Sequence, residues 1–111
     1  MKKLVWLGLL LMMCANTFAA PSAKDLLSAC EDSLENGFHG TTGLMCSWYV
    51  TPCDCHHGKN IAIPRVCLIG NETEASLAKI VVDALKKKPT LQLKPAELAA
   101  GLILSSVYPC D

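Results

Sequence analysis

The sequence lacks most of the features that mark membrane proteins, nucleic-acid-binding proteins and enzymes. Its long apolar run, Leu4–Met13, has about ten residues, whereas a bilayer-spanning helix needs about 20. There is no C-x-x-C pair, no glycine-rich turn around a nucleophile, no internal repeat and no β-hairpin signal. Ten basic residues balance ten acidic ones, so no basic face for nucleic acid is indicated. We expect a protein that is not an enzyme and needs no cofactor.

The N-terminus has the pattern of a secretory signal. Lys2 and Lys3 precede the short apolar run, and Thr17 and Ala19 occupy positions −3 and −1 of a small-residue cleavage site. We therefore predict that residues 1–19 are a signal peptide that is removed on export.

Two other interpretations of this segment are weaker. An anchor helix would need a longer apolar run. A lipoprotein signal needs small residues directly before its modified cysteine, and Cys14 follows Met12 and Met13. Residues 20–111 then form one domain. The signal holds two of the ten basic residues and no acidic one, so the mature chain has a net charge of −2.

The predicted mature chain is rich in cysteine for its size. An even number of cysteines in a small exported chain is typical of a disulfide framework. Six cysteines allow 15 connectivities, so the residues alone leave the pairing open. The six are Cys30, Cys46, Cys53, Cys55, Cys67 and Cys110.

Helical periodicity and capping residues predict an all-α fold, a small four-helix domain stapled by disulfides. Ser22 and Thr73 are suitable N-caps for the first and third helices, and the segment Gly37–Gly43 is predicted as a loop. The four predicted helices are Ala23–Glu35, Thr42–Val50, Glu74–Lys88 and Pro95–Val107.

The apolar positions of these helices predict which sides face the core. In the first helix they are Leu26, Leu27, Cys30 and Leu34. In the third they are Leu77, Ile80, Val81, Ala84 and Leu85, and in the fourth Leu98, Ala99, Leu102, Ile103 and Ser106. Trp48 and Tyr49 are adjacent on the second helix and point about 100° apart. We expect core packing for this aromatic pair, with one of the two nearer the surface.

The segment Cys53-Asp54-Cys55-His56-His57 contains good ligands for zinc or copper. Its spacing is too cramped for a usual structural zinc site, and Cys67 stands alone after it. Oxidation in an exported chain would also consume the thiols. We therefore predict disulfides and two loop histidines here and no metal.

Three features together resemble the Tai/Rap type of immunity protein, which protects bacteria from cell-wall amidase effectors of the type VI secretion system. The first helix ends near a cysteine, in Leu26–Cys30, and a C-x-x-Y-V element follows at Cys46–Val50. The C-terminal half, from Cys67–Gly70 through Lys94–Leu98 to Tyr108–Cys110, resembles the family's cysteine-bounded stretch.

The resemblance implies a periplasmic, all-helical protein, commonly a homodimer, that binds an amidase effector and occludes its active-site cleft. It also implies that Cys67 pairs with Cys110, and Cys30 with Cys46. The chain departs from the family at Pro52, where a glycine usually follows the Tyr-Val element. Cys53 and Cys55 are left without assigned partners.

An inhibitor needs a rigid platform and a projecting element, because preorganisation lowers the ordering cost of binding. The predicted loop of residues 51–71 is the first candidate, and its effector-binding candidates are His56, His57, Lys59 and Asn60. The connection Lys88–Lys94 is the second candidate. Acidic residues on the first helix are predicted to steer a basic effector; they are Asp25, Glu31, Asp32 and Glu35.

Two alternatives remain from the sequence. A periplasmic acid-stress chaperone shares the small size, the helices and a disulfide, and would lose its tertiary structure near pH 2–3. A metal carrier would use Cys53, Cys55, His56 and His57, and would keep free thiols in the purified protein.

Overall fold

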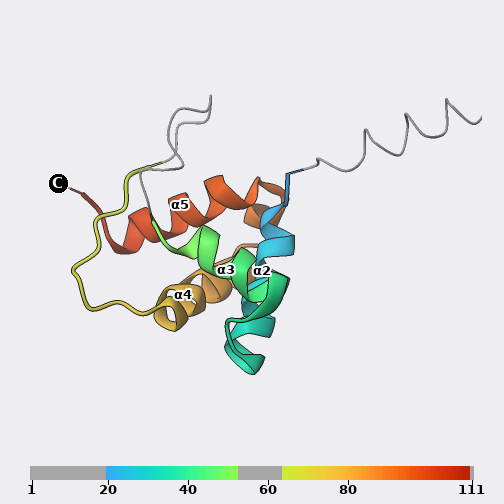
Figure 1. Cartoon of the computed structure of the whole chain (residues 1–111). Coiled ribbons are helices and arrows are strands. Elements are labelled where there is room, and N and C mark those ends of the chain that lie inside the picture. Colours follow the sequence, from blue (N-terminus) through green and yellow to red (C-terminus); the bar gives the residue numbers. More distant parts are fainter. Residues whose placement is uncertain (1–19, 53–63, 111) are drawn as a thin grey trace, which may run out of the picture.

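The computed structural model describes residues 20–52 and 64–110 and shows helices packed around one core (Figure 1). These ranges contain four α-helices, one 3-10 helix and no strand, so the predicted all-α class is confirmed. In chain order the elements are α2 (Ala23–Asn36), α3 (Gly40–Val50), α4 (Glu74–Lys87), the 3-10 helix η2 (Pro89–Leu93) and α5 (Ala96–Val107).

Helix α2 makes the most extensive contacts of the described domain, packing against α3, α4, η2 and α5. Its predicted capping is confirmed: Ser22 accepts a hydrogen bond from the backbone N–H of Asp25, and the Asp25 carboxylate accepts one from the N–H of Ser22. This reciprocal pair satisfies two N–H groups that a helix start leaves without partners.

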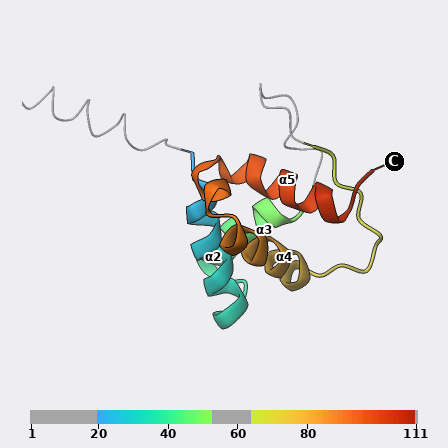
Figure 2. The same cartoon turned by 180° about the vertical axis from the view of Figure 1, so that it is seen from behind.

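The start of α2 is also tied to the start of α5, seen where the blue and orange segments meet in Figure 2. The backbone N–H of Ala23 donates to the carbonyl of Lys94 at 2.8 Å, and the N–H of Ala96 donates to the carbonyl of Pro21 at 3.1 Å. These bonds hold the first and last helices of the described domain together at one end.

The core lies between α2 and the inner sides of the other three helices. Its largest fully buried side chains include Leu26, Val50, Val81, Leu85 and Leu104, one or more from each helix. Burying a leucine or valine side chain stabilises the fold by about 1.5–3 kcal/mol, so these residues supply much of the driving force. The two half-cystines Cys30 and Cys46 complete this core.

The predicted inner side of α2 is wrong at one position. Leu34 is 38% exposed, and its neighbour Ser33 is buried in its place. The Ser33 hydroxyl donates a 2.8 Å hydrogen bond to the carbonyl of Ala29 one turn earlier. Because this bond satisfies the hydroxyl, a serine can occupy a core position that hydrophobicity alone would assign to leucine.

Helix α3 begins two residues earlier than predicted, and the expected loop at Gly37–Gly43 shrinks to a short turn. Gly37 and Gly40 make this turn with φ values of 102° and 72°, which favour glycine. Gly43 lies inside the helix, where a Cβ atom would come within 2.5 Å of the Phe38 backbone carbonyl carbon. This glycine serves close packing rather than a loop.

Helix α4 matches its prediction closely. Thr73 caps its start in a reciprocal pair with Ser76, and Lys88 is its C-cap. Leu77, Val81 and Leu85 are buried on its inner side, and the other two predicted positions, Ile80 and Ala84, are partly buried.

The predicted inner side of α5 is correct at Ala99 and Ile103 but wrong at Leu102 and Ser106, which are exposed. The buried side of α5 is rotated about the helix axis by about one residue from the predicted side. It consists mostly of small residues. Its members are Ala96, Ala99, Ala100, Gly101, Ile103 and Leu104. Small residues allow closer helix approach, so they face the core while Leu102 lies near the surface.

The segment of residues 64–73 crosses the outside of the domain before α4, and we call it the strap (Figure 1). A disulfide joins Cys67 of the strap to Cys110 beyond the end of α5, with Cα atoms 5.2 Å apart. The N–H of Cys67 also donates to the carbonyl of Tyr108 at 3.0 Å. Both contacts hold the strap against the C-terminal end of α5, in the pairing that the resemblance implied.

Candidate functional site: the outer face of α3

The orientation of α3 is set by its disulfide. Cys46 is bonded to Cys30 of α2, with Cα atoms 5.0 Å apart, and both residues are fully buried. This is the second pairing that the resemblance implied. Val50 lies one turn after Cys46 and is also fully buried. These two residues define the inner side of α3.

An α-helix turns about 100° per residue. The residues two positions before and after Cys46 therefore lie on the opposite side of α3. Trp48, two residues after Cys46, is 52% exposed, and Leu44, two residues before it, is 69% exposed. Met45 and Tyr49 are partly buried beside them. We call this surface the α3 face; it consists of Thr41, Leu44, Met45, Trp48 and Tyr49. These residues line an open hollow of about 460 Å³.

The α3 face is apolar and its helix is uncharged. Helix α3 is the one α-helix of the described ranges whose sequence contains no Asp, Glu, Lys or Arg. Exposed aromatic and long aliphatic side chains that are grouped together are typical of protein interaction surfaces, whereas single exposed apolar residues are common everywhere. The α3 face therefore has the composition of a binding surface.

A carboxylate lies at each edge of the α3 face. At the edge next to Leu44, the hydroxyl of Ser47 donates a 2.8 Å hydrogen bond to the carboxylate of Glu74 in the first turn of α4. At the other edge, burial and, to a smaller extent, the negative charge of Glu97 raise the pKa of the Tyr49 phenol above its ordinary value. Glu97 belongs to the first turn of α5. Both neighbouring helices thus present negative charge to α3.

The effector-binding candidates named from the sequence are His56, His57, Lys59 and Asn60, and they lie outside the described residues. The same holds for Cys53 and Cys55 and so for the metal ligands of the alternative hypothesis. Of the predicted 51–71 loop, the structure describes residues 51–52 and 64–71. The α3 face ends directly before this loop, at the Tyr49-Val50 step.

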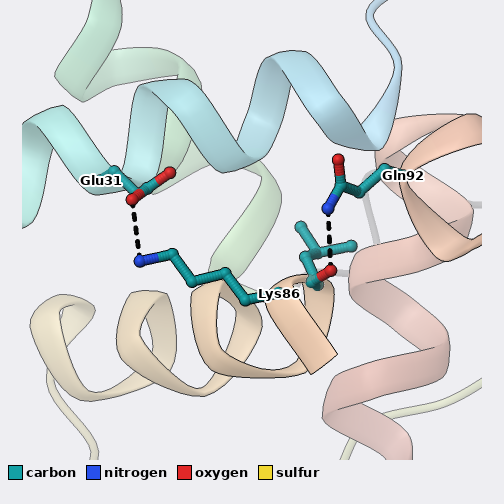
Figure 3. Close-up of polar contacts among 4 residues, drawn as sticks. Glu31, Lys86 and Gln92 are labelled. Atoms are coloured by element: carbon teal, nitrogen blue, oxygen red, sulfur yellow. Dashed lines mark hydrogen bonds and ion pairs between the residues drawn. The ribbon is translucent and has the colours of Figure 1, made fainter. Parts of the chain in front are cut away.

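The second projecting candidate, the connection Lys88–Lys94, folds as the 3-10 helix η2 and packs against α2, α4 and α5. The side-chain amide of Gln92 donates a 2.9 Å hydrogen bond to the carbonyl of Leu85 (Figure 3). Leu93 at its end is 84% exposed. Leu91 and Gln92 are partly buried against the domain, whereas the other residues of the connection are exposed.

The acidic side chains of α2 are partly engaged within the domain. Glu31 forms an ion pair with Lys86 of α4, with 2.9 Å between the carboxylate oxygen and Nζ (Figure 3). Asp25 belongs to the helix cap, and Asp32 accepts a hydrogen bond from Asn36. The proposed steering of a basic effector therefore has fewer uncommitted carboxylates on α2 than the sequence suggests.

The core of the described residues is almost wholly apolar. Ser33 is their one buried polar residue, and its hydroxyl is bonded to the backbone. Within residues 20–52 and 64–110, no group of three His, Cys, Asp or Glu residues is placed to hold a metal ion. No helix of these ranges is long and apolar enough to cross a bilayer.

The core-packing prediction for Trp48 and Tyr49 correctly placed one of the two nearer the surface, but it did not identify the α3 face as a surface. The structure gives Tyr49 a partly buried position and leaves half of Trp48 exposed. The signal was present: once Cys46 is bonded to the first helix, Leu44 and Trp48 must lie on the other side of α3.

Comparison with known proteins identifies the family. The family model described as Rap1a immunity proteins matches residues 22–110. The chain belongs to the Rap1a immunity protein family. The match spans all four α-helices and both disulfides of the described domain. No curated protein and no solved structure matches the chain.

Membership of the Rap1a family indicates an immunity function of the type VI secretion kind, in which the partner of the protein is a toxin effector. Immunity proteins of this family are generally not enzymes.

Proposed function

We propose that this chain is a periplasmic immunity protein that binds a peptidoglycan amidase effector of a type VI secretion system and inhibits it by covering the active-site cleft. The family match over residues 22–110 is the observation that carries this proposal. The amidase class of the effector comes from the resemblance of the Cys46–Val50 element and the cysteine-bounded C-terminal half to Tai/Rap proteins.

The compartment is proposed from two further observations. Residues 1–19 have the pattern of a cleaved secretory signal. The described part of the domain carries two disulfides, which form and persist in oxidising compartments such as the periplasm. A wall-degrading effector acts in that same compartment, so an inhibitor is useful there.

The architecture suits an inhibitor. Disulfides fix α3 to α2 and the strap to the end of α5, so the surface groups are held in place before binding. A rigid surface loses less conformational entropy on association, and the gain appears as affinity. We further propose that the protein forms a homodimer, as the resemblance implies.

We expect the gene of a small cysteine amidase beside the gene of this chain, and the test uses that amidase together with the full chain and its signal. Expression of the amidase in the periplasm of a susceptible bacterium should lyse the cells, and co-expression of this chain should restore growth. A matched version without residues 1–19 should remain in the cytoplasm and give no protection. Failure of the exported chain to protect, together with absence of a complex in a pull-down, would contradict the proposal.

A further inference from the structure

The α3 face has three properties that a partner must match. It is apolar across its centre, where Leu44 and Trp48 are 69% and 52% exposed. It is hollowed only slightly, with an open volume of about 460 Å³ over its side chains. It is bordered by Glu74 at one edge and Glu97 at the other.

We propose that the α3 face is the surface that receives the effector, and that its occupant is an apolar side chain flanked by lysine or arginine residues. This inference rests on the proposed function, since the partner is the amidase effector. The apolar side chain fills the hollow beside Leu44 and Trp48. The flanking cations approach Glu74 and Glu97.

Protein interfaces usually have an apolar centre and a polar rim, and the α3 face is divided in the same way. A few buried aromatic and aliphatic anchors supply most of the binding energy, and polar groups at the rim keep out water and select the partner. Trp48 is a suitable anchor because tryptophan is enriched among residues whose truncation is costly. Glu74 and Glu97 lie at the rim of the α3 face, where their charges select a cationic partner.

The charges at the edges favour the effector over a second copy of this chain. A two-fold dimer applies the same patch to itself. The carboxylates at both edges of one α3 face would then meet the carboxylates of the other copy, in either relative orientation of the helices. Like charges placed together at an interface disfavour association. A cationic partner surface carries no such cost.

The Ser47–Glu74 hydrogen bond contributes to this arrangement. It holds the Glu74 carboxylate 2.8 Å from the hydroxyl of an α3 residue, so the charge is already placed beside the face before a partner arrives. The structure of the domain thus supplies one fixed anionic group at the Leu44 edge. Preorganised charge of this kind raises association rates and lowers the ordering cost.

The experiment measures binding of the oxidised mature chain to the amidase encoded beside its gene. Leu44→Ala and Trp48→Ala should each raise Kd at least tenfold, chiefly through faster dissociation. The matched control is Ile69→Ala, since Ile69 is 83% exposed on the strap, away from α3. This control should bind like the wild type, and near-UV dichroism of every variant should show an unchanged fold.

A second measurement, of the association rate, tests the charges of Glu74 and Glu97 at the edges of the α3 face. The double variant Glu74→Gln and Glu97→Gln should slow association severalfold at low salt and reduce the salt dependence of the association rate. The control here is Asp83→Asn, which removes an exposed carboxylate of α4 and keeps both edge carboxylates of the α3 face.

The possible results separate this inference from the proposed function. If the wild type does not bind the amidase, both are overturned. If it binds and Leu44→Ala and Trp48→Ala bind equally well, the α3 face is not the docking surface, although the proposed function stands. If these variants convert a dimer into a monomer in light scattering without changing amidase affinity, the face belongs to a second copy and the inference is wrong.

Discussion

Cys46 on α3 is covalently joined to Cys30 on α2, and Trp48, two residues later on the same helix, is 52% exposed on the opposite side. One bond therefore sets both the buried and the exposed side of α3. Without it, a helix with no charged residue would have little else in its sequence to decide which side faces water.

This relationship predicts the effect of removing the bond. Cys30→Ala combined with Cys46→Ala should lower the free energy of unfolding by about 3 kcal/mol, since the bond closes a loop with a sequence separation of 16. Urea unfolding followed by far-UV dichroism measures this. Alanine avoids the unsatisfied buried hydroxyl that a serine would place in the core. A loss below about 0.5 kcal/mol would contradict the prediction.

The two disulfides should differ in accessibility to reductants. Cys30 and Cys46 are fully buried, whereas Cys67 is exposed on the strap and Cys110 is partly exposed. Thiol–disulfide exchange requires direct approach of a thiolate to a sulfur atom. Under a mild reductant, the Cys67–Cys110 bond should therefore open first. Alkylation followed by peptide mass spectrometry reports the order, and earlier labelling of Cys30 or Cys46 would show that the prediction is wrong.

The Glu72 carboxylate accepts hydrogen bonds from backbone N–H groups of the strap just before α4. We therefore predict that these contacts depend on pH. Desolvation raises the pKa of Glu72, but hydrogen bonds from backbone N–H groups, those of Gly70 and Ile69 first, outweigh it and lower the pKa below 4.5. These bonds are 2.9 and 2.6 Å long. Because the folded pKa is depressed, their contribution is present above pH 4.5 and is lost as the pH falls through the folded value.

Nuclear magnetic resonance can follow this titration directly. The side-chain carboxyl signal of Glu72 should titrate with a midpoint below 4.5, and the amide signals of Ile69 and Gly70 should shift over the same pH range. In Glu72→Gln those two amide signals should lose this pH dependence. A Glu72 midpoint at or above 4.5 would count against the hydrogen-bonded strap.

Acid should leave the tertiary structure intact, in contrast to the acid-stress chaperone hypothesis. Among the described residues, Ser33 is the single buried polar or charged residue, so acid places no new charge in the core. Acid unfolding mostly arises from buried or paired groups that must change protonation. The exposed Glu31–Lys86 pair contributes little. Near-UV dichroism at pH 2.5 should match that at pH 7, whereas its disappearance would favour the chaperone.

Local signals in the sequence predicted the helices well. The caps at Ser22 and Thr73 act over three residues of chain, and both form as expected. The end of α4 at its lysine run follows from the dipole and from Pro89. Such features depend on neighbours in the sequence, so they can be recognised without knowledge of the fold.

Features that depend on distant contacts were harder to predict. Leu102 is exposed because small residues of α5 take the inner side. The exposure of Trp48 depends on the partner of Cys46. The α3 face can therefore be recognised only when the partner of Cys46 is known. The sequence-based candidates stay a prediction; they are His56, His57, Lys59 and Asn60.

The central claim, that this chain neutralises an amidase effector, is tested most directly by an activity titration. Purified amidase encoded beside the gene is incubated with peptidoglycan and increasing amounts of the oxidised mature chain, and release of cleaved peptide is measured. Amidase activity should fall linearly and reach baseline near one immunity chain per amidase. Full amidase activity in the presence of a severalfold molar excess of the chain would contradict it.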